Sequence, residues 1–172
     1  FHAHTGGSGG KGTVEEAFAY ARQVENLDFF AVTDHSNSFD NAEQGAVDAD
    51  GTRISQEWAA GKAAAESVTD DTFVGIFGYE MTWQEDLAIG HISTFGTPGW
   101  QTRDQAGMNT LKGYLNVLAS VPESVSQFNH PGTVYGDFRN FSEYSPQYDT
   151  SVHLLEVGGE GSFTAYDAYT TA

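Results

Sequence analysis

Short apolar runs alternate along this chain with stretches that have a helical pattern of apolar positions. Five runs have the length and composition of buried strands: 27–32, 72–77, 91–95, 125–128 and 152–157. Three stretches between them have the pattern of amphipathic or alanine-rich helices: 14–24, 55–67 and 110–119. Strands that alternate with helices predict an α/β domain with parallel strands. The polar stretch 36–53 predicts a long loop, and residues 1–4 predict the end of a further strand.

Residues that bind metal ions or transfer protons lie at or near the ends of the predicted strands. They are His2, His4, Asp34, His35, Glu80, His130 and Glu156. In α/β barrels, the carboxyl ends of parallel strands meet at one face, and active sites are assembled there. We therefore expect these side chains to converge.

Three of these positions favour a metal ion on simple physical grounds. His2 and His4 are two residues apart, so on an extended chain both imidazoles point to the same side. Asp34 precedes His35 and can either bind an ion or hydrogen-bond a ligand of one. Glu80 ends a buried strand, where an unpaired carboxylate is costly and a nearby cation would remove that cost. Each residue alone has an ordinary structural explanation, and the hypothesis depends on the whole set.

The remaining histidines divide into two kinds. His91 follows a glycine, and His130 lies in the turn sequence Asn-His-Pro-Gly, so both resemble the histidines at the predicted strand ends. His153 lies within a predicted strand between apolar neighbours, and we interpret it as structural.

Composition limits the partners and the metal ligands that this chain can use. The 172 residues suit one domain, and 24 acidic residues against 7 basic ones give a net charge of −17. That charge argues against nucleic acid as a partner, because binding would require basic side chains that neutralise phosphates. No apolar run approaches the roughly 18 residues of a membrane-spanning helix. The chain has no cysteine, so metal chemistry depends on histidine and carboxylate, which favour zinc, manganese or iron over magnesium or calcium.

A series of motifs follows along the chain: Phe-His-Ala-His-Thr at 1–5, Leu-Asp-Phe-Phe-Ala-Val-Thr-Asp-His at 27–35, Gly-Tyr-Glu-Met-Thr-Trp at 78–83, Gly-His-Ile at 90–92, Gln-Phe-Asn-His-Pro-Gly at 127–132 and Leu-Leu-Glu-Val at 154–157. In this order they resemble the PHP (polymerase and histidinol phosphatase) superfamily. The Glu-Met-Thr-Trp and Asn-His-Pro-Gly elements are most similar to its carbaryl-hydrolase-like branch. The resemblance extends over nearly the whole chain.

The resemblance implies a distorted (β/α)7 barrel that holds two or three divalent metal ions at its carboxyl-terminal mouth. Carried over motif by motif, it implies the metal ligands His2, His4, His35, Glu80, His91 and His130. Glu80 matches the carboxylate that bridges two ions, and Glu80, His35 and Asp34 are the catalytic candidates.

The chain departs from the family pattern in two places. Many members have an Asp or His soon after His-x-His, whereas Gly9 stands at the equivalent position here. The family also has a late Asp-x-His that this sequence lacks. We therefore expect residues 1–172 to be a single domain, and a fragment without the final strands and part of the first strand.

The expected function is that of a metal-dependent phosphoesterase acting on a small phosphorylated molecule, in which a hydroxide shared by two ions attacks phosphorus. Arg103 and Arg139 are candidates for binding the substrate phosphate. One alternative is a hydrolase of carboxyl esters, carbamates or amides on the same metal site. Another is a non-catalytic binding module that contains metal. We expect a secreted or cell-surface bacterial protein, with a cytoplasmic one as the alternative.

Overall fold

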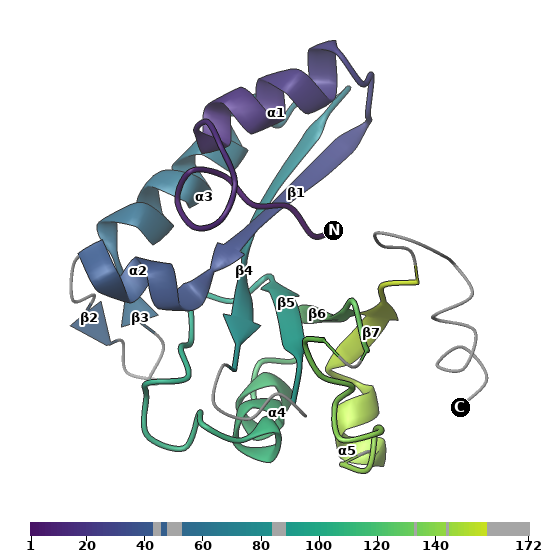
Figure 1. Cartoon of the computed structure of the whole chain (residues 1–172). Helices are drawn as coiled ribbons and strands as arrows, with labels where there is room; N and C mark the ends of the chain where they lie inside the picture. Colours follow the sequence, from purple (N-terminus) through teal and green to yellow (C-terminus); the bar gives the residue numbers. More distant parts are fainter. Residues whose placement is uncertain (43–45, 48–52, 84–88, 133, 144, 158–172) are drawn as a thin grey trace.

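The computed structural model describes residues 1–42, 46–47, 53–83, 89–132, 134–143 and 145–157. At its centre is a five-stranded sheet with the strand order β1-β4-β5-β6-β7 (Figure 1). The strands are β1 (Phe29–His35), β4 (Val74–Thr82), β5 (His91–Phe95), β6 (Val125–Asn129) and β7 (Val152–Leu155). A separate antiparallel pair joins β2 (Ala46–Val47) to β3 (Arg53–Ile54).

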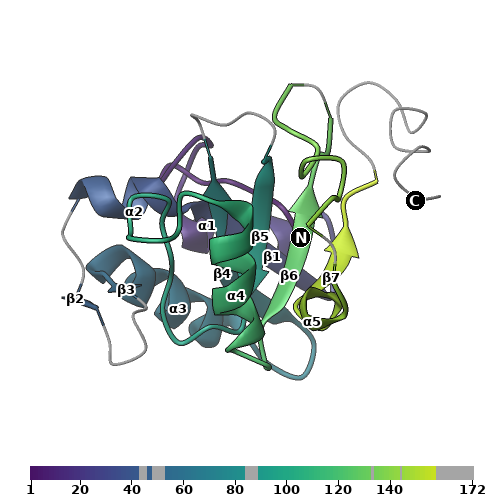
Figure 2. The same ribbon diagram turned by 90° about the horizontal axis from the view of Figure 1, so that it is seen from below.

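Five helices are described: α1 (Val14–Gln23), α2 (Ser36–Ala42), α3 (Gln56–Val68), α4 (Leu111–Ala119) and α5 (Pro146–Asp149). Figure 2 shows α2 and α3 beside β4 towards one end of the sheet, and α5 beside β7 at the other. The three predicted helices are confirmed, and each begins at a hydroxyl side chain that accepts a backbone N–H of the first turn. These N-caps are Thr13, Ser55 and Thr110.

The expected (β/α)7 barrel is wrong, because the described residues form a mixed α/β domain around one five-stranded sheet and only five helices. β5 runs antiparallel to both β4 and β6, while β1 pairs parallel with β4 and β6 parallel with β7. A parallel crossover needs a dozen or more residues, whereas the connection at 83–90 from β4 to β5 is too short for one. β5 therefore runs antiparallel to β4, and the described strands do not form a barrel of parallel strands.

Two local expectations are also corrected. Residues 36–53 contain α2 and the β2–β3 pair rather than one long loop. Residues 1–4 are extended but belong to no strand, and they lie beside β1 with a hydrogen bond from the N–H of Thr33 to the carbonyl oxygen of Ala3 (2.8 Å).

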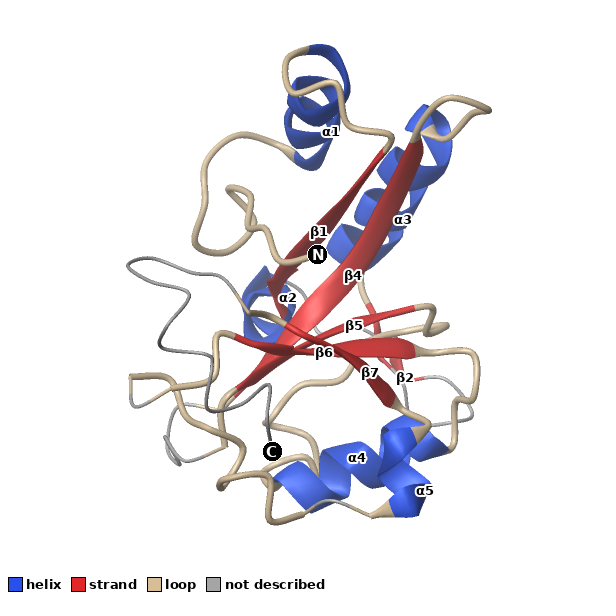
Figure 3. Cartoon of the chain, turned by 90° about the vertical axis from the view of Figure 1, so that its right-hand side faces the viewer, coloured by secondary structure: helices blue, strands red, loops and turns tan. Residues whose placement is uncertain are grey.

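The two faces of the sheet carry different side chains, aromatic rings on one face and polar groups on the other. Figure 3 shows the helices packed around the sheet. On β4, the rings of Phe77 and Tyr79 pack against Trp58 of α3, with centroid distances of 5.5 and 5.8 Å. Tyr114 of α4 donates a hydrogen bond to the hydroxyl of Tyr79 (3.0 Å), so α4 covers the same face. Because side chains alternate along a strand, Glu80 points to the opposite face. That face carries the candidate site.

Candidate metal centre

The strand pairing brings the predicted residues together at one edge of the sheet. His35, at the end of β1, pairs with Glu80 on β4, and His91 pairs with Thr82. His91 also pairs with Asn129, the residue before His130. Since β5 is antiparallel, its first residue rather than its last lies at this edge. His91 therefore joins the other residues because it begins an antiparallel strand, and not because it follows the end of a parallel one.

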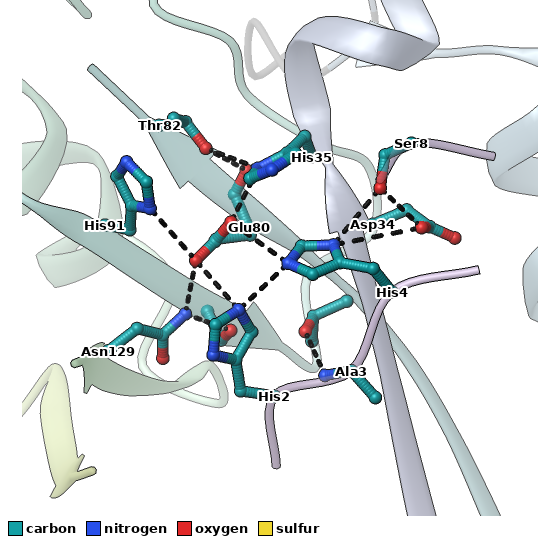
Figure 4. A network of polar contacts seen from close by, with 12 residues as sticks. His2, Ala3, His4, Ser8, Asp34, His35, Glu80, Thr82, His91 and Asn129 are labelled. Carbon is teal, nitrogen blue, oxygen red and sulfur yellow. Dashed lines mark hydrogen bonds and ion pairs between the residues drawn. The ribbon is translucent and has the colours of Figure 1, made fainter. Parts of the chain in front are cut away.

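Glu80 is the centre of the site. Its side chain is fully buried, and five imidazole rings surround its carboxylate. Figure 4 shows four of them, those of His2, His4, His35 and His91. The nitrogen–oxygen distances are 2.6 Å from His35 Nδ1, 3.1 Å from His2 Nε2, 3.4 Å from His91 Nδ1, and 3.5 Å from His4 Nε2 and His130 Nε2. All six predicted metal ligands thus lie together.

The carboxylate of Glu80 is held in its charged form. Burial acts to raise its pKa, but hydrogen bonds with His130, His2, His35 and His91 outweigh burial and hold that pKa far below its usual range. A further hydrogen bond comes from Asn129, whose Nδ2 donates to Glu80 Oε1 over 2.8 Å. Glu80 therefore places a buried negative charge at the centre of the site, the electrostatic condition that favours a cation nearby.

The ligand atoms form two groups that share Glu80. We call them the His2 half (His2, Glu80 and His130) and the His4 half (His4, His35 and Glu80). His91 lies against Oε1 of Glu80, and its ring centroid is 5.0 Å from that of His130.

The spacing of these atoms fits a bound divalent ion. Metal–nitrogen distances of roughly 2.0–2.1 Å place two ligands of a tetrahedral ion about 3.3 Å apart. Within the His2 half, His2 Nε2 and His130 Nε2 lie 3.1 and 3.5 Å from Glu80 Oε1. Within the His4 half, His4 Nε2 lies 3.5 Å from Glu80 Oε2. Among the described side chains, buried His130 Nδ1 has no hydrogen-bond partner. A mixed set of imidazole and carboxylate suits zinc, manganese or iron.

Hydrogen bonds behind the ligands fix their orientation. Asp34 is buried and accepts from Thr5 N (2.8 Å), Thr5 Oγ1 (2.6 Å) and Ser8 Oγ (2.6 Å). The hydroxyl of Ser8 also lies 3.1 Å from His4 Nδ1. Asp34 thus anchors the loop that follows His4. Its predicted catalytic role is untested by these contacts, which place it behind a ligand.

Three further polar residues complete the site, and sequence reasoning gave them no role. Thr82 Oγ1 lies 2.8 Å from His35 Nδ1, and its position two residues after Glu80 could have indicated the shared face. Asn129 was visible in the Asn-His-Pro-Gly motif. Ser93, which accepts from Asn129 Nδ2 over 2.8 Å, gave no signal because a serine within a strand is ordinary.

Glycine and backbone geometry position two of the ligands. Gly90, before His91, has φ +101°, and a Cβ there would meet the ring of Phe138 at 2.8 Å. Gly10 packs against the carbonyl of His4 more closely than any side chain would allow. His130 itself has φ +27°, a region that non-glycine residues rarely adopt.

The two arginines expected to bind phosphate, and the histidine interpreted as structural, lie in different parts of the molecule. Arg103 Nη1 donates to the carbonyl oxygen of Thr82 (3.1 Å) and to Asn37 Oδ1 (3.2 Å), so it lies next to the site. Arg139 is exposed in the turn 138–141, where four successive residues have φ of 54–55°. His153 is exposed on β7 and belongs to neither ligand group.

Comparison with protein-family models, with curated proteins and with solved structures finds no match. Among the described residues, no helix combines the length and apolar character needed to cross a membrane. The case for function therefore depends on the site itself.

Proposed function

We propose that this protein is a metal-dependent hydrolase, with divalent ions held between Glu80 and the surrounding histidines. The observation that carries the proposal is the convergence of five imidazoles on one fully buried carboxylate. The six residues come from separate segments, and distances of 3.1–3.5 Å from the Nε2 atoms of His2, His4 and His130 to Glu80 support ion binding. The ordered motifs that resemble the PHP superfamily support the same class.

The residues would divide the work between two ions. His2, Glu80 and His130 would hold one ion, and His4, His35 and Glu80 the other. A pair of divalent ions supplies Lewis-acid catalysis, which lowers the pKa of water and neutralises charge on the substrate. Asn129 keeps the shared carboxylate in place, and Thr82 orients His35.

We propose a small phosphoester as the substrate. The chain has a net charge of −17, which would repel a phosphorylated molecule at long range. Cations in the site reverse that sign locally, because bound ions are the largest charges in such a site. Arg103, anchored at Thr82, is the side chain best placed to add a further positive charge.

Metal analysis followed by an activity assay tests the proposal. We expect purified protein to bind about two zinc or manganese ions per chain, as the two ligand groups predict, and to hydrolyse p-nitrophenyl phosphate. Fewer than one ion per chain would contradict the hydrolase proposal. A loaded protein that is inactive on phosphoesters but active on p-nitrophenyl acetate or an aryl carbamate would correct the substrate class. A loaded protein inactive on all three would indicate a binding module.

A further inference from the structure

Glu156 follows β7 and reaches the centre from the last described strand. Its backbone N–H donates to the carbonyl oxygen of Phe128 on β6 (2.9 Å), which fixes the position of its backbone. Its carboxylate oxygen Oε2 then contacts two members of the His2 half. It lies 3.1 Å from Nδ1 of His2 and accepts the backbone N–H of His130 over 3.1 Å.

The first contact determines the tautomer of His2. An ionised carboxylate can only accept hydrogen bonds, so the proton of His2 must lie on Nδ1, facing Glu156. Nε2, the atom that faces Glu80 and His4, is then the nitrogen that would give up its proton and offer a lone pair to an ion. A carboxylate behind a ligating histidine also makes the other ring nitrogen a stronger ligand.

The second contact supports a strained backbone. His130 has φ +27°, and such conformations cost of order 1–3 kcal/mol and persist only where the surroundings hold them. The hydrogen bond to Glu156 satisfies the N–H of His130 in this conformation, in which Nε2 points to Glu80. A single carboxylate oxygen therefore orients both histidines of one ligand group.

We infer that Glu156 is the positioning residue of the His2 half, holding the ring of His2 and the backbone of His130 in the arrangement that binds an ion. This inference rests on the proposed function. The His4 half has a hydroxyl in the corresponding place, because Ser8 Oγ faces Nδ1 of His4. Removal of Glu156 should therefore affect the two halves unequally.

Zinc titration of the intact chain against a competing chelator tests the inference. Glu156→Ala should weaken one of the two zinc ions by about 10–100-fold, the range for outer partners of metal ligands, and leave the second unchanged. Glu156→Gln keeps the size and one acceptor but loses the charge, so its affinity should fall between. Glu123→Ala is the matched control, because Glu123 is exposed and precedes β6 at the end away from the site.

The ring of His2 provides a second measurement. In ¹⁵N spectra of the zinc-loaded wild type, the Nδ1 proton of His2 should exchange slowly with water because it is hydrogen-bonded to Glu156, and this protection should be lost in Glu156→Ala. If Glu156→Ala does not fold, as judged by circular dichroism with zinc present, Glu156→Gln carries the test. Equal zinc affinity in Glu156→Gln, Glu156→Ala and wild type, or equal weakening of both ions, would overturn the inference alone. A wild type that binds no zinc would overturn it together with the proposed function.

Discussion

His2 and His4 are the same residue type, lie two positions apart and both face Glu80, yet they differ in charge. Burial acts to lower both pKa values. For His2, hydrogen bonds with Glu156 and Glu80 outweigh burial and raise the pKa from 6.5 to about 9. For His4, burial dominates and lowers the pKa to about 4.

The difference lies in what each ring meets on its far side. Nδ1 of His2 contacts a carboxylate, whereas Nδ1 of His4 contacts the hydroxyl of Ser8, with Asp34 more distant at 3.9 Å. Glu80 also lies nearer His2 (3.1 Å) than His4 (3.5 Å), and the neighbouring His35 and His2 further lower the pKa of His4. The surroundings of each ring therefore set its charge, and the two halves of the candidate centre are not equivalent.

Replacing Glu80 should weaken both halves of the centre, and so remove the difference between them. Glu80→Gln keeps the volume but removes the charge that both halves share. We expect both ions to bind more than about 100-fold more weakly, since outer partners alone are worth 10–100-fold. Metal analysis after dialysis measures this loss. Retention of either ion would show that one half binds metal without the shared carboxylate.

Variants of His130 and His35 should separate the halves. His130 belongs to the His2 half and His35 to the His4 half, so each alanine variant should lose one ion and keep the other. His153→Ala is the control, since His153 is exposed on β7, and it should retain both ions. Metal content per chain distinguishes these outcomes. Equal loss in all three variants would contradict the assignment of the ligands.

The stability of the metal-free protein should have a maximum near pH 6.5, the ordinary pKa of histidine. As the pH rises from 6.5 through about 9, folded His2 keeps a proton that the unfolded chain has lost, so its stabilising contribution disappears. As the pH falls from 6.5 through about 4, the unfolded chain gains a proton that folded His4 refuses, so stability falls again. The lowered pKa values of Glu80 and Glu156 add to the loss in acid.

Urea unfolding in the presence of a chelator, from pH 4 to pH 9, measures this profile. His2→Gln should flatten the alkaline side and His4→Gln the acid side between about pH 4 and 6.5. Stability that rises between pH 6.5 and 9 in the wild type would contradict the assignment of charge to His2.

The smallest effect is expected from Ser8. Ser8→Ala removes the hydroxyl between His4 and Asp34, but it leaves Asp34 with both hydrogen bonds from Thr5. A neutral hydrogen bond contributes roughly 0.5–1.5 kcal/mol, which corresponds to a loss of zinc affinity of about tenfold or less. Chelator competition would detect it. If Ser8→Ala lowered zinc affinity more than Glu156→Ala does, the His4 half would depend more than the His2 half on the residue behind its histidine, which contradicts the comparison.

The sequence was sufficient to predict which residues gather, but not the architecture that gathers them. Apolar runs that end in Asp-His or Glu place those residues at strand ends, and all six predicted ligands do converge. The direction of β5 was not predicted, because the apolar residues of a buried strand read alike in both directions. Helix α2 was not predicted for a separate reason: its polar sequence Ser-Asn-Ser-Phe-Asp-Asn-Ala has little helical preference of its own.

The residues that hydrogen-bond the candidate ligands from behind could not be predicted from the sequence, for another reason. Glu156 stands 154 positions from His2, and only the parallel pairing of β6 with β7 brings its carboxylate to that ring. Residues such as Thr82 and Asn129 were predictable as neighbours of ligands but not as hydrogen-bond partners. Their roles depend on side-chain directions that are set by packing.

The extended segment 1–5 has a consequence for how quickly ions could enter and leave. It carries His2 and His4 but belongs to no strand. One hydrogen bond, from the N–H of Thr33 to the carbonyl oxygen of Ala3, joins its backbone to that of β1, and hydrogen bonds from Ala3 and Thr5 to the side chains of Thr33 and Asp34 add to it. Segments held by few such bonds open at a small fraction of the cost of global unfolding. We expect this segment to detach while the sheet stays intact, withdrawing one ligand from each half at once. Metal exchange would then be a gated process, with its rate set by local opening and its affinity set by the buried carboxylate.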